Sequence, residues 1–247
     1  MRLLLIDNSN TRTKLTLSNR DKLEQSLSVI PTEEVTVHTL AENLQGITYD
    51  ATLISSVVPE KAKVMEGFFS RKPCHFLSHQ SRLPIGIDYP KPEQIGADRL
   101  ANAAAAHQLF GSPAIVLDFG TAVTFDIISQ DRDKNPIYQG GVIAPGLASM
   151  TEGLARRTAL LPHIELEEPE RAIGKSTEQA MLAGAVYGYR GLVREIIKQI
   201  QNEIPQEATI IATGGDASLI SRGLPEIKHH CPQLTLDGLR IIANLNL

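Results

Sequence analysis

The sequence predicts an α/β protein made of two related halves, and two short stretches carry that prediction. In residues 115–128, an apolar run ends in Asp118, a turn containing glycine and threonine follows, and a second apolar run leaves. This order is typical of two strands joined by a tight turn. Residues 3–17 show the same order about 110 positions earlier, with Asp7 in the place of Asp118. Because one chain carries the unit twice, we expect two related halves.

The residues at these turns suit a particular chemistry. Gly120 has no Cβ, so another group can approach its backbone closely. Thr121 and Thr124 add hydroxyl groups beside the acid. A carboxylate next to glycine and hydroxyls suits a cation and phosphate oxygens. One such stretch alone is explained equally well by an ordinary β-hairpin with a polar turn and no ligand. Two such hairpins that face each other, however, predict a cleft between domains, where ligands commonly bind.

Composition narrows the class of protein. The 247 residues are 42% hydrophobic and 21% charged, as in ordinary globular proteins. A net charge of −4 without a basic block, together with 4% aromatic residues, argues against a nucleic-acid partner. No apolar run approaches the ~20 residues of a membrane span. Met1 and Arg2 lead directly into a strand, and the two cysteines fit a reducing compartment. We therefore expect a cytoplasmic protein without a membrane segment.

The first half predicts the order β-β-β-α-β-α-β. Pro31 and the acids after it are typical of a helix start, and Gly46 of a helix end. The expected elements are strands at 2–7, 11–18, 23–30, 51–58 and 74–77, and helices at 31–46 and from Pro59 to 69. Residues 80–95 contain four turn-forming Pro and Gly residues and predict extended, irregular chain around Tyr89.

An alanine-rich helix is expected at 100–109, where Gly111 ends it. It is preceded by Gly96-Ala97-Asp98-Arg99, so Asp98 lies at its N-terminus. Asp at this position commonly caps a helix. The sequence alone leaves a capping role and a functional role for Asp98 equally open.

The second half repeats this order with longer helices. Strands are expected at 137–143, 209–212 and 233–236, and helices from Gly146 to 157, at 177–200, 219–224 and 237–244. Ala180, Gly184 and Gly188 recur every four residues on the helix 177–200 and make one smooth face. That face predicts either close packing on the sheet of its own domain or contact with a second copy of the chain.

Three further stretches resemble known motifs only weakly. Residues 173–177 contain Gly-Lys-Ser, but Pro169 occupies the first glycine position of a phosphate-binding loop and no strand precedes it. Ser176 or Thr177 as a helix cap is the better interpretation. Residues 229–231, His-His-Cys, have no second ligand pair at a zinc-finger spacing. Residues 214–215, Gly-Gly after a strand, are weak evidence for a nucleotide loop.

Six segments occur together in an order that resembles a known family. They are Asp7-Asn8-Ser9-Asn10-Thr11, Ser55-Ser56-Val57-Val58-Pro59, Gly96-Ala97-Asp98-Arg99, Asp118-Phe119-Gly120-Thr121-Ala122, Gly140-Gly141-Val142-Ile143-Ala144-Pro145-Gly146 and Ile173-Gly174-Lys175-Ser176-Thr177. The chain is similar over nearly its whole length to the type III pantothenate kinases, in the superfamily of acetate kinases, sugar kinases, heat-shock chaperones and actin. The combination is specific, although each segment alone is not.

The resemblance implies two duplicated ribonuclease H-like domains, at 1–112 and 113–247, with the active site in the cleft between them. It implies ATP-dependent phosphorylation of pantothenate to 4'-phosphopantothenate, the first step of coenzyme A biosynthesis, in a homodimer. The expected cofactors are ATP, Mg²⁺ carried by ATP, and a monovalent cation, K⁺ or NH₄⁺.

The resemblance also implies roles for individual residues. Asp98 is the expected catalytic base and Asp118 the ligand of the monovalent cation. The residues expected to bind ATP are Asp7, Asn8, Ser9, Asn10, Thr11, Arg12, Thr13, Lys14 and Thr121. The residues expected to bind pantothenate are Tyr89, Gly96, Ala97, Asp98, Arg99 and Thr177.

One position departs from the family pattern. Ser9 stands where the family has glycine, and its Cβ predicts a loop farther from the phosphates and weaker nucleotide binding. The alternative function is therefore a catalytically weak regulatory protein of the same fold, because the family resembles accessory factors linked to transcription. Consumption of ATP in the presence of pantothenate separates the two.

Overall fold

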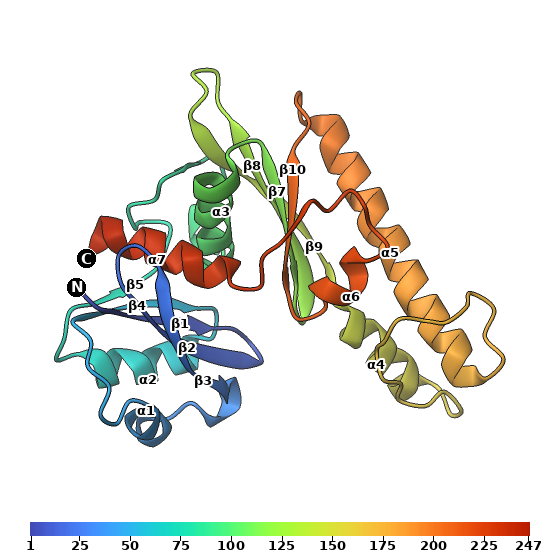
Figure 1. Ribbon diagram of the computed structural model, residues 1–247, viewed down its shortest axis with the longest axis horizontal. Helices are drawn as coiled ribbons and strands as arrows, with labels where there is room; N and C mark the ends of the chain where they lie inside the picture. The colour runs from blue at the N-terminus through green and yellow to red at the C-terminus, as the bar shows by residue number, and fades with distance from the viewer. The chain divides into compact units, whose positions relative to one another are not determined.

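The computed structural model describes residues 1–247, which divide into two compact units (Figure 1). The first unit comprises Met1–Gly111, Gln130–Gln139 and Gln233–Leu247, and the second comprises Ser112–Ser129 and Gly140–Pro232. The units therefore differ from the two continuous segments expected from the sequence, since two later segments fold with the first. No helix in the chain is long and apolar enough to cross a membrane.

The first unit is built on a five-stranded sheet of order β3-β2-β1-β4-β5. Its strands are β1 (Leu3–Asn8), β2 (Arg12–Ser18), β3 (Leu23–Pro31), β4 (Ala51–Ser56) and β5 (Cys74–Phe76). β1, β2 and β3 are antiparallel neighbours, whereas β4 and β5 continue the sheet in parallel with β1. The β1–β2 pair is the first hairpin, and it places Asp7 opposite Lys14.

Helices cover both faces of this sheet, which explains the unbroken apolar run in β1. Leu4 and Ile6 pack with Leu40 of α1 (Val37–Asn43) and with Met65 and Phe69 of α2 (Pro59–Phe69). The opposite face is contacted by α3 (Ala97–Phe110) and α7 (Leu234–Asn246). Every residue of β1 is consequently buried.

The last helix shows why the chain does not divide into two consecutive domains. α7 packs against α3 so closely that a side chain at Gly238 would collide with the carbonyl of Ala101. The hydroxyl of Thr235 also donates a hydrogen bond to Oδ1 of Asn102, at 2.8 Å. The expected strand at 233–236 is wrong, because these residues begin a helix with a wide buried face.

The second sheet has the order β11-β10-β7-β8-β9-β6. Its strands are β6 (Gly86–Ile87), β7 (Ala114–Phe119), β8 (Ala122–Gln130), β9 (Pro136–Pro145), β10 (Thr209–Gly214) and β11 (His229–His230). Its order β9-β8-β7-β10-β11 repeats β3-β2-β1-β4-β5 of the first sheet strand by strand. The β7–β8 pair is antiparallel and is the second hairpin, with Asp118 opposite Thr124. The prediction of two related α/β halves is confirmed.

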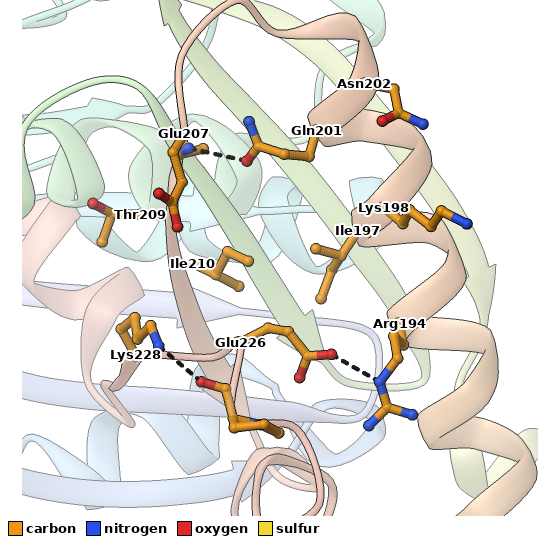
Figure 2. Close-up of a pocket in the computed structure, with 12 residues that line it drawn as sticks. Arg194, Ile197, Lys198, Gln201, Asn202, Glu207, Thr209, Ile210, Glu226 and Lys228 are labelled. Atoms are coloured by element: carbon orange, nitrogen blue, oxygen red, sulfur yellow. Dashed lines mark hydrogen bonds and ion pairs between the residues drawn. The ribbon is translucent and has the colours of Figure 1, made fainter.

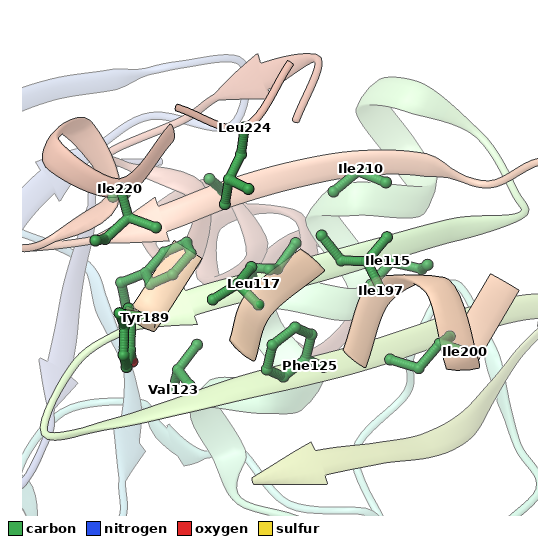
Figure 3. Packing of buried hydrophobic residues seen from close by; sticks show 14 of the residues in the cluster. Ile115, Leu117, Val123, Phe125, Tyr189, Ile197, Ile200, Ile210, Ile220 and Leu224 are labelled. Atoms are coloured by element: carbon green, nitrogen blue, oxygen red, sulfur yellow. The ribbon is translucent and has the colours of Figure 1, made fainter. Parts of the chain in front are cut away.

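The core of the second unit lies between its sheet and the long helix α5 (Thr177–Glu203) (Figure 3). Leu117 and Phe125 contribute from the neighbouring strands β7 and β8, and Ile197 from α5 (Figure 3). Ile220 of the short helix α6 (Ala217–Ser221) completes this cluster. The helix α4 (Leu147–Arg157) contacts α5 within the same unit.

Local hydrogen bonding corrects two further expectations. The expected helix at 31–46 is instead the end of β3, a 3-10 turn η1 (Thr32–Glu34) and the short helix α1. Thr36 begins α1, where its side chain and that of Thr39 cap each other's backbone. The expected helix at 219–224 begins and ends earlier, as α6. A second 3-10 turn, η2 (Pro92–Gln94), precedes α3.

Candidate active site

The first hairpin holds a buried carboxylate at its turn. The side chain of Asp7 is only 3% exposed, and its Oδ2 lies 3.4 Å from Nζ of Lys14 on the facing strand. The hydroxyl of Ser9 donates a hydrogen bond to Oδ1 of Asp7, at 3.1 Å. Asn10 and Thr11 are exposed at the turn itself. The structure thus brings five of the nine residues expected to bind ATP together at one buried carboxylate and one exposed turn.

Side chains from outside the hairpin hold this turn in place. Oγ1 of Thr32 donates to the carbonyl of Ser9, at 2.7 Å, and contacts Oγ1 of Thr13, at 3.0 Å. The hydroxyl of Ser56 donates to Oδ1 of Asn8, at 2.6 Å. Thr32 was missed in the sequence analysis because it was expected in a helix, and nothing in its local pattern signals a contact with the hairpin.

Asp98 does not cap α3. The N-cap position is Gly96, which makes no side-chain cap, so Asp98 lies inside the first turn. Its Oδ1 accepts a hydrogen bond from the N–H of Arg99, at 2.8 Å, and its carboxylate folds back over Gly96. A Cβ on Gly96 would meet that carboxylate, so a larger residue there would require Asp98 to shift its side chain. The capping alternative for Asp98 is therefore wrong, and Asp98 is half-buried at the helix start.

Two of the residues expected to bind pantothenate, Tyr89 and Arg99, contact a tyrosine that the sequence analysis did not single out. The ring of Tyr138 is fully buried and meets Tyr89 edge-on, with centroids 6.3 Å apart. The guanidinium carbon of Arg99 lies 5.8 Å from the centroid of the same ring. Because cations are attracted to aromatic faces, Tyr138 helps to orient Arg99 beside Asp98.

In the second unit, the turn of the second hairpin packs against the start of α4. The N–H of Gly146 donates to the carbonyl of Thr121, at 3.1 Å, and the hydroxyl of Ser149 donates to the same oxygen, at 2.9 Å. A side chain at Gly146 would collide with the carbonyls of Gly120 and Thr121. The positive end of a helix therefore lies directly beside this turn, an arrangement that favours phosphate groups.

The loop after β10 reaches the same turn. Gly214 has φ +95°, a left-handed conformation that favours glycine, and its α-carbon is packed against the backbone of Phe119. The N–H of Asp216 points at the carbonyl of Phe119, at 3.4 Å. At Gly215 a Cβ would meet nothing, so the backbone there is open to an approaching ligand. The two glycines that the sequence marks as a weak nucleotide-loop signal thus lie beside Phe119, at the start of the second hairpin turn.

Two titratable groups border this part of the second unit. Burial raises the pKa of Tyr189, and the nearby charge of Asp216 raises it further, so the phenol stays protonated. Its hydroxyl donates to the carbonyl of Pro145, at 3.2 Å, immediately before Gly146. Burial also raises the pKa of Asp216 above its ordinary value. Tyr189 therefore stabilises the backbone just before α4 begins. The sequence does not predict this role, because it shows Tyr189 only as one residue of a helix.

Thr177 is the first residue of α5 and is exposed. Oγ of Ser176 accepts a hydrogen bond from the N–H of Gln179, at 3.2 Å, so the predicted cap is confirmed. Gly174 is required because a Cβ there would collide with the backbone of Ala180. The glycine of this P-loop-like stretch therefore serves helix packing, and its conformation gives no support to a phosphate loop.

No cluster of three or more metal-binding side chains exists, including at His229.

A surface groove of about 910 Å³ lies elsewhere in the second unit (Figure 2). It lies between the C-terminal part of α5 and the first residues of β10, with the ion pair between Arg194 and Glu226 at one side (Figure 2). In sheets of this kind, ligands bind at the carboxyl ends of the parallel strands. The groove lies at the amino end of β10, and no predicted site residue lines it.

Comparison with solved structures finds proteins that share this fold. The chain superimposes with a TM-score of 0.61 on a structure described as a conserved putative Baf family transcriptional activator from Campylobacter jejuni, at 19% identity, covering 98% of this chain and 97% of the other. A putative N-acetylmannosamine kinase from Listeria monocytogenes matches with a TM-score of 0.56, at 9% identity, over 98% of both chains. At these identities the likeness concerns the fold alone.

Sequence comparison gives the family. Residues 3–199 match the family model described as type III pantothenate kinase. A protein of Akkermansia muciniphila named type III pantothenate kinase is 55% identical over 247 residues, covering 100% of both chains. The chain belongs to the type III pantothenate kinase family.

Proposed function

We propose that this protein is an ATP-dependent kinase that phosphorylates pantothenate to 4'-phosphopantothenate, the first step of coenzyme A biosynthesis. The observation that carries the proposal is the 55% sequence identity, over the full length of both chains, to a protein named for this activity. Two features of the structure support the proposal: each sheet has a hairpin that carries a carboxylate, and Asp98 lies at the start of α3.

In the first unit, Asp98 is the proposed catalytic base. The hydroxyl of pantothenate is a poor nucleophile at neutral pH, so its proton must be accepted as the bond to phosphorus forms. A half-buried carboxylate at the start of a helix, which accepts a hydrogen bond from the N–H of Arg99, is suited to that task. Arg99, steadied by the ring of Tyr138, binds the carboxylate of pantothenate, and Tyr89 lines the same region.

We propose that the hairpin turns contact phosphate oxygens of ATP. In the first unit the donors are Lys14 and the exposed backbone at Asn10 and Thr11, and in the second unit the donor is the hydroxyl of Thr121. The start of α4, beside Thr121, adds a favourable dipole. Phosphoryl transfer of this kind depends on positioning and charge stabilisation, which fits donors fixed on strand ends.

The donor atoms present fit the expected cations. Carboxylate oxygens are preferred ligands of Mg²⁺ and of alkali cations, and both turns carry one, from Asp7 and from Asp118. Mg²⁺ arrives with ATP and neutralises charge on the transferred phosphate when it is bound. We assign the monovalent cation to Asp118, whose position at a strand end leaves backbone carbonyls nearby.

The surface of the second unit supports a homodimer. Ala180 and Gly184 are exposed on α5, so their smooth face does not pack on the sheet of its own unit. Large apolar side chains are also exposed on α4, on the segments around it and on α5, namely Ile143, Met150, Leu154, Leu160, Ile173 and Tyr187. Apolar surface of this extent commonly marks an interaction site, and a second copy of the chain is the proposed partner.

The decisive experiment incubates the purified protein with ATP, Mg²⁺, K⁺ and pantothenate. ADP formation is followed together with the mass of the product. The proposal expects a product heavier than pantothenate by one phosphoryl group, formed only when all components are present. Binding of ATP without any turnover of pantothenate would contradict the proposal and would favour the regulatory alternative.

A further inference from the structure

A series of short hydrogen bonds between side chains holds the turn of the first hairpin. Oγ of Ser56 donates to Oδ1 of Asn8, and Nδ2 of Asn8 donates to Oγ1 of Thr13, at 2.6 and 2.7 Å. Thr32 uses its only hydroxyl proton on the carbonyl of Ser9, so Thr13 must donate across the 3.0 Å contact to Thr32. The last acceptor in this series of hydrogen bonds is therefore the backbone carbonyl of Ser9.

Ser9 is fixed from its other side as well. Its N–H donates to the carbonyl of Arg12, at 3.1 Å, which closes the hairpin turn. Lys134 is the only non-glycine residue with a positive φ, so the backbone of Ser9 has no need of glycine. With both backbone groups held, the side chain has a defined direction, and its hydroxyl donates to Oδ1 of Asp7, at 3.1 Å.

The Asp7 carboxylate thus has one neutral and one charged partner. The neutral partner is Ser9, on Oδ1, and the charged partner is Lys14, whose ammonium lies 3.4 Å from Oδ2. Lys14 is 38% exposed along its side chain, whereas Asp7 is 3% exposed. The ammonium can therefore turn toward an anion in solvent, while the carboxylate keeps its place only if Ser9 continues to hold it.

We propose that Ser9 is a positioning residue that keeps the buried Asp7 carboxylate in place when Lys14 leaves it for the phosphates of a nucleotide. This inference rests on the proposed function, because it takes the first hairpin as the phosphate-binding turn. It reverses the expectation from the sequence, in which a side chain at this position weakens nucleotide binding. In this chain the serine compensates for its Cβ by a hydrogen bond that glycine cannot make.

The test compares Ser9→Ala, Ser9→Gly and Ser9→Thr with the unaltered protein. The binding of ADP with Mg²⁺ is measured by calorimetry, and KM and kcat are measured for both substrates. A hydrogen bond to a charged group corresponds to a change of about 10-fold or more. We expect Ser9→Ala and Ser9→Gly to weaken Mg-ADP binding and to raise KM for ATP by about 10-fold, with KM for pantothenate unchanged. Ser9→Thr keeps the hydroxyl and restores most of the affinity.

A matched control lies at the other end of the same hairpin. Ser18 donates to the carbonyls of Asn19 and Lys22 and has no contact with Asp7. Ser18→Ala is expected to change thermal stability without changing the affinity for Mg-ADP. If it weakens nucleotide binding as much as Ser9→Ala does, the effect is one of general stability and the inference is wrong.

Two other outcomes would also overturn the inference. Mg-ADP affinity of Ser9→Ala equal to that of the unaltered protein would show that the hydroxyl does nothing for binding. Normal affinity in Ser9→Gly, with a loss only in Ser9→Ala, would show that space rather than the hydroxyl matters. Calorimetry with Mg-ADP needs no turnover, so the result stands apart from any failure to phosphorylate pantothenate.

Discussion

Asp98 has a different local role from the one that its place at a helix start predicts. Its carboxylate bonds to the N–H of the next residue and bends over Gly96, and it leaves the capping position to that glycine. Asp7 is likewise defined by short contacts, to Ser9 and Lys14. The surroundings of both carboxylates are therefore set by specific short contacts.

The first prediction concerns Asp98→Asn. The amide keeps the size of the carboxylate but cannot accept the proton of the substrate hydroxyl, so kcat should fall by about 10²- to 10⁴-fold. The melting temperature should hardly change. Asp98→Ala should lose no cap, and at most about 0.3–1 kcal/mol from the missing negative charge near the helix N-terminus. Steady-state kinetics and thermal unfolding of both variants provide the measurements, and a wild-type kcat for Asp98→Asn would disprove the catalytic assignment.

The second prediction concerns the cation at Asp118. Replacing K⁺ by Na⁺ at constant ionic strength should lower the rate, because a smaller ion fits a site for a large monovalent cation poorly. Asp118→Asn should be less active and should no longer distinguish the two ions. Initial rates in KCl, NH₄Cl and NaCl test this. Equal rates of the unaltered protein in all three salts would exclude a specific monovalent site.

At the scale of elements, close backbone contacts decide how helices meet. Gly238 allows α7 to lie on α3, and Gly146 allows α4 to lie on the second hairpin turn. Arg190 of α5 has a buried side chain that donates to Glu168 by two hydrogen bonds, of 2.8 and 2.7 Å, and to the carbonyls of Leu219 and Ile220 at α6. These contacts connect segments that are distant in sequence.

The third prediction tests the contact between α3 and α7. Gly238→Ala places a Cβ against the carbonyl of Ala101, so the free energy of unfolding should fall by about 1–3 kcal/mol. Gly67→Ala is the matched control, because Gly67 is an exposed helix position in the same unit where a Cβ meets nothing. Alanine there should raise the free energy of unfolding by up to about 1 kcal/mol. Denaturant unfolding of both variants distinguishes close packing from helix propensity.

The fourth prediction concerns pH and the ion pair between Glu168 and Arg190. Hydrogen bonds from the Arg190 guanidinium hold the pKa of Glu168 below its ordinary value of 4.5. A carboxyl group with a lowered folded-state pKa stabilises the fold above pH 4.5 and loses this contribution as pH falls through the folded-state pKa. Glu168→Gln should therefore be less stable than the unaltered protein at pH 7, with the difference shrinking below pH 4.5.

Melting temperatures between pH 3 and pH 7 measure this difference. Glu167→Gln is the control, since it removes the same charge from an exposed neighbouring position. Its stability relative to the unaltered protein should depend far less on pH. If the difference in melting temperature between Glu168→Gln and the unaltered protein stayed constant down to pH 3, the stabilising role of the ion pair between Glu168 and Arg190 would be contradicted.

At the scale of the whole molecule, the same strand order occurs twice, and the last helix of the second repeat folds with the first unit. Of the eleven large apolar side chains that are exposed, six belong to the second unit, where they lie on β9, on α4, on α5 and between these two helices. The second unit is therefore the expected place of contact between two copies of the chain.

The fifth prediction concerns that contact. Light scattering after size-exclusion chromatography should give twice the mass of 26.9 kDa. Gly188→Glu places a charged side chain on the smooth face of α5 and should yield a monomer with its fold intact. Gly67→Glu, on the exposed face of α2, should leave the dimer unchanged. A monomeric unaltered protein at the concentration of the assay would rule the dimer out.

The sequence by itself determined the features that depend on local pattern. The acid-ended strands at Asp7 and Asp118, their hairpins and the Ser176 cap follow from apolar periodicity and from turn and capping chemistry, which act within a few residues. The ordered set of motifs also sufficed for the family.

Only the tertiary structure decided which distant segments meet. Several contacts join residues that are far apart in the chain. They are those of Thr32 with the first turn, of Tyr138 with Arg99, of Gly214 with Phe119 and of α7 with α3. Local pattern carries no information about them, because each depends on how whole elements pack. The same reason explains the wrong strand at 233–236, where burial against α3 and the first sheet favours a helix over the alternating pattern.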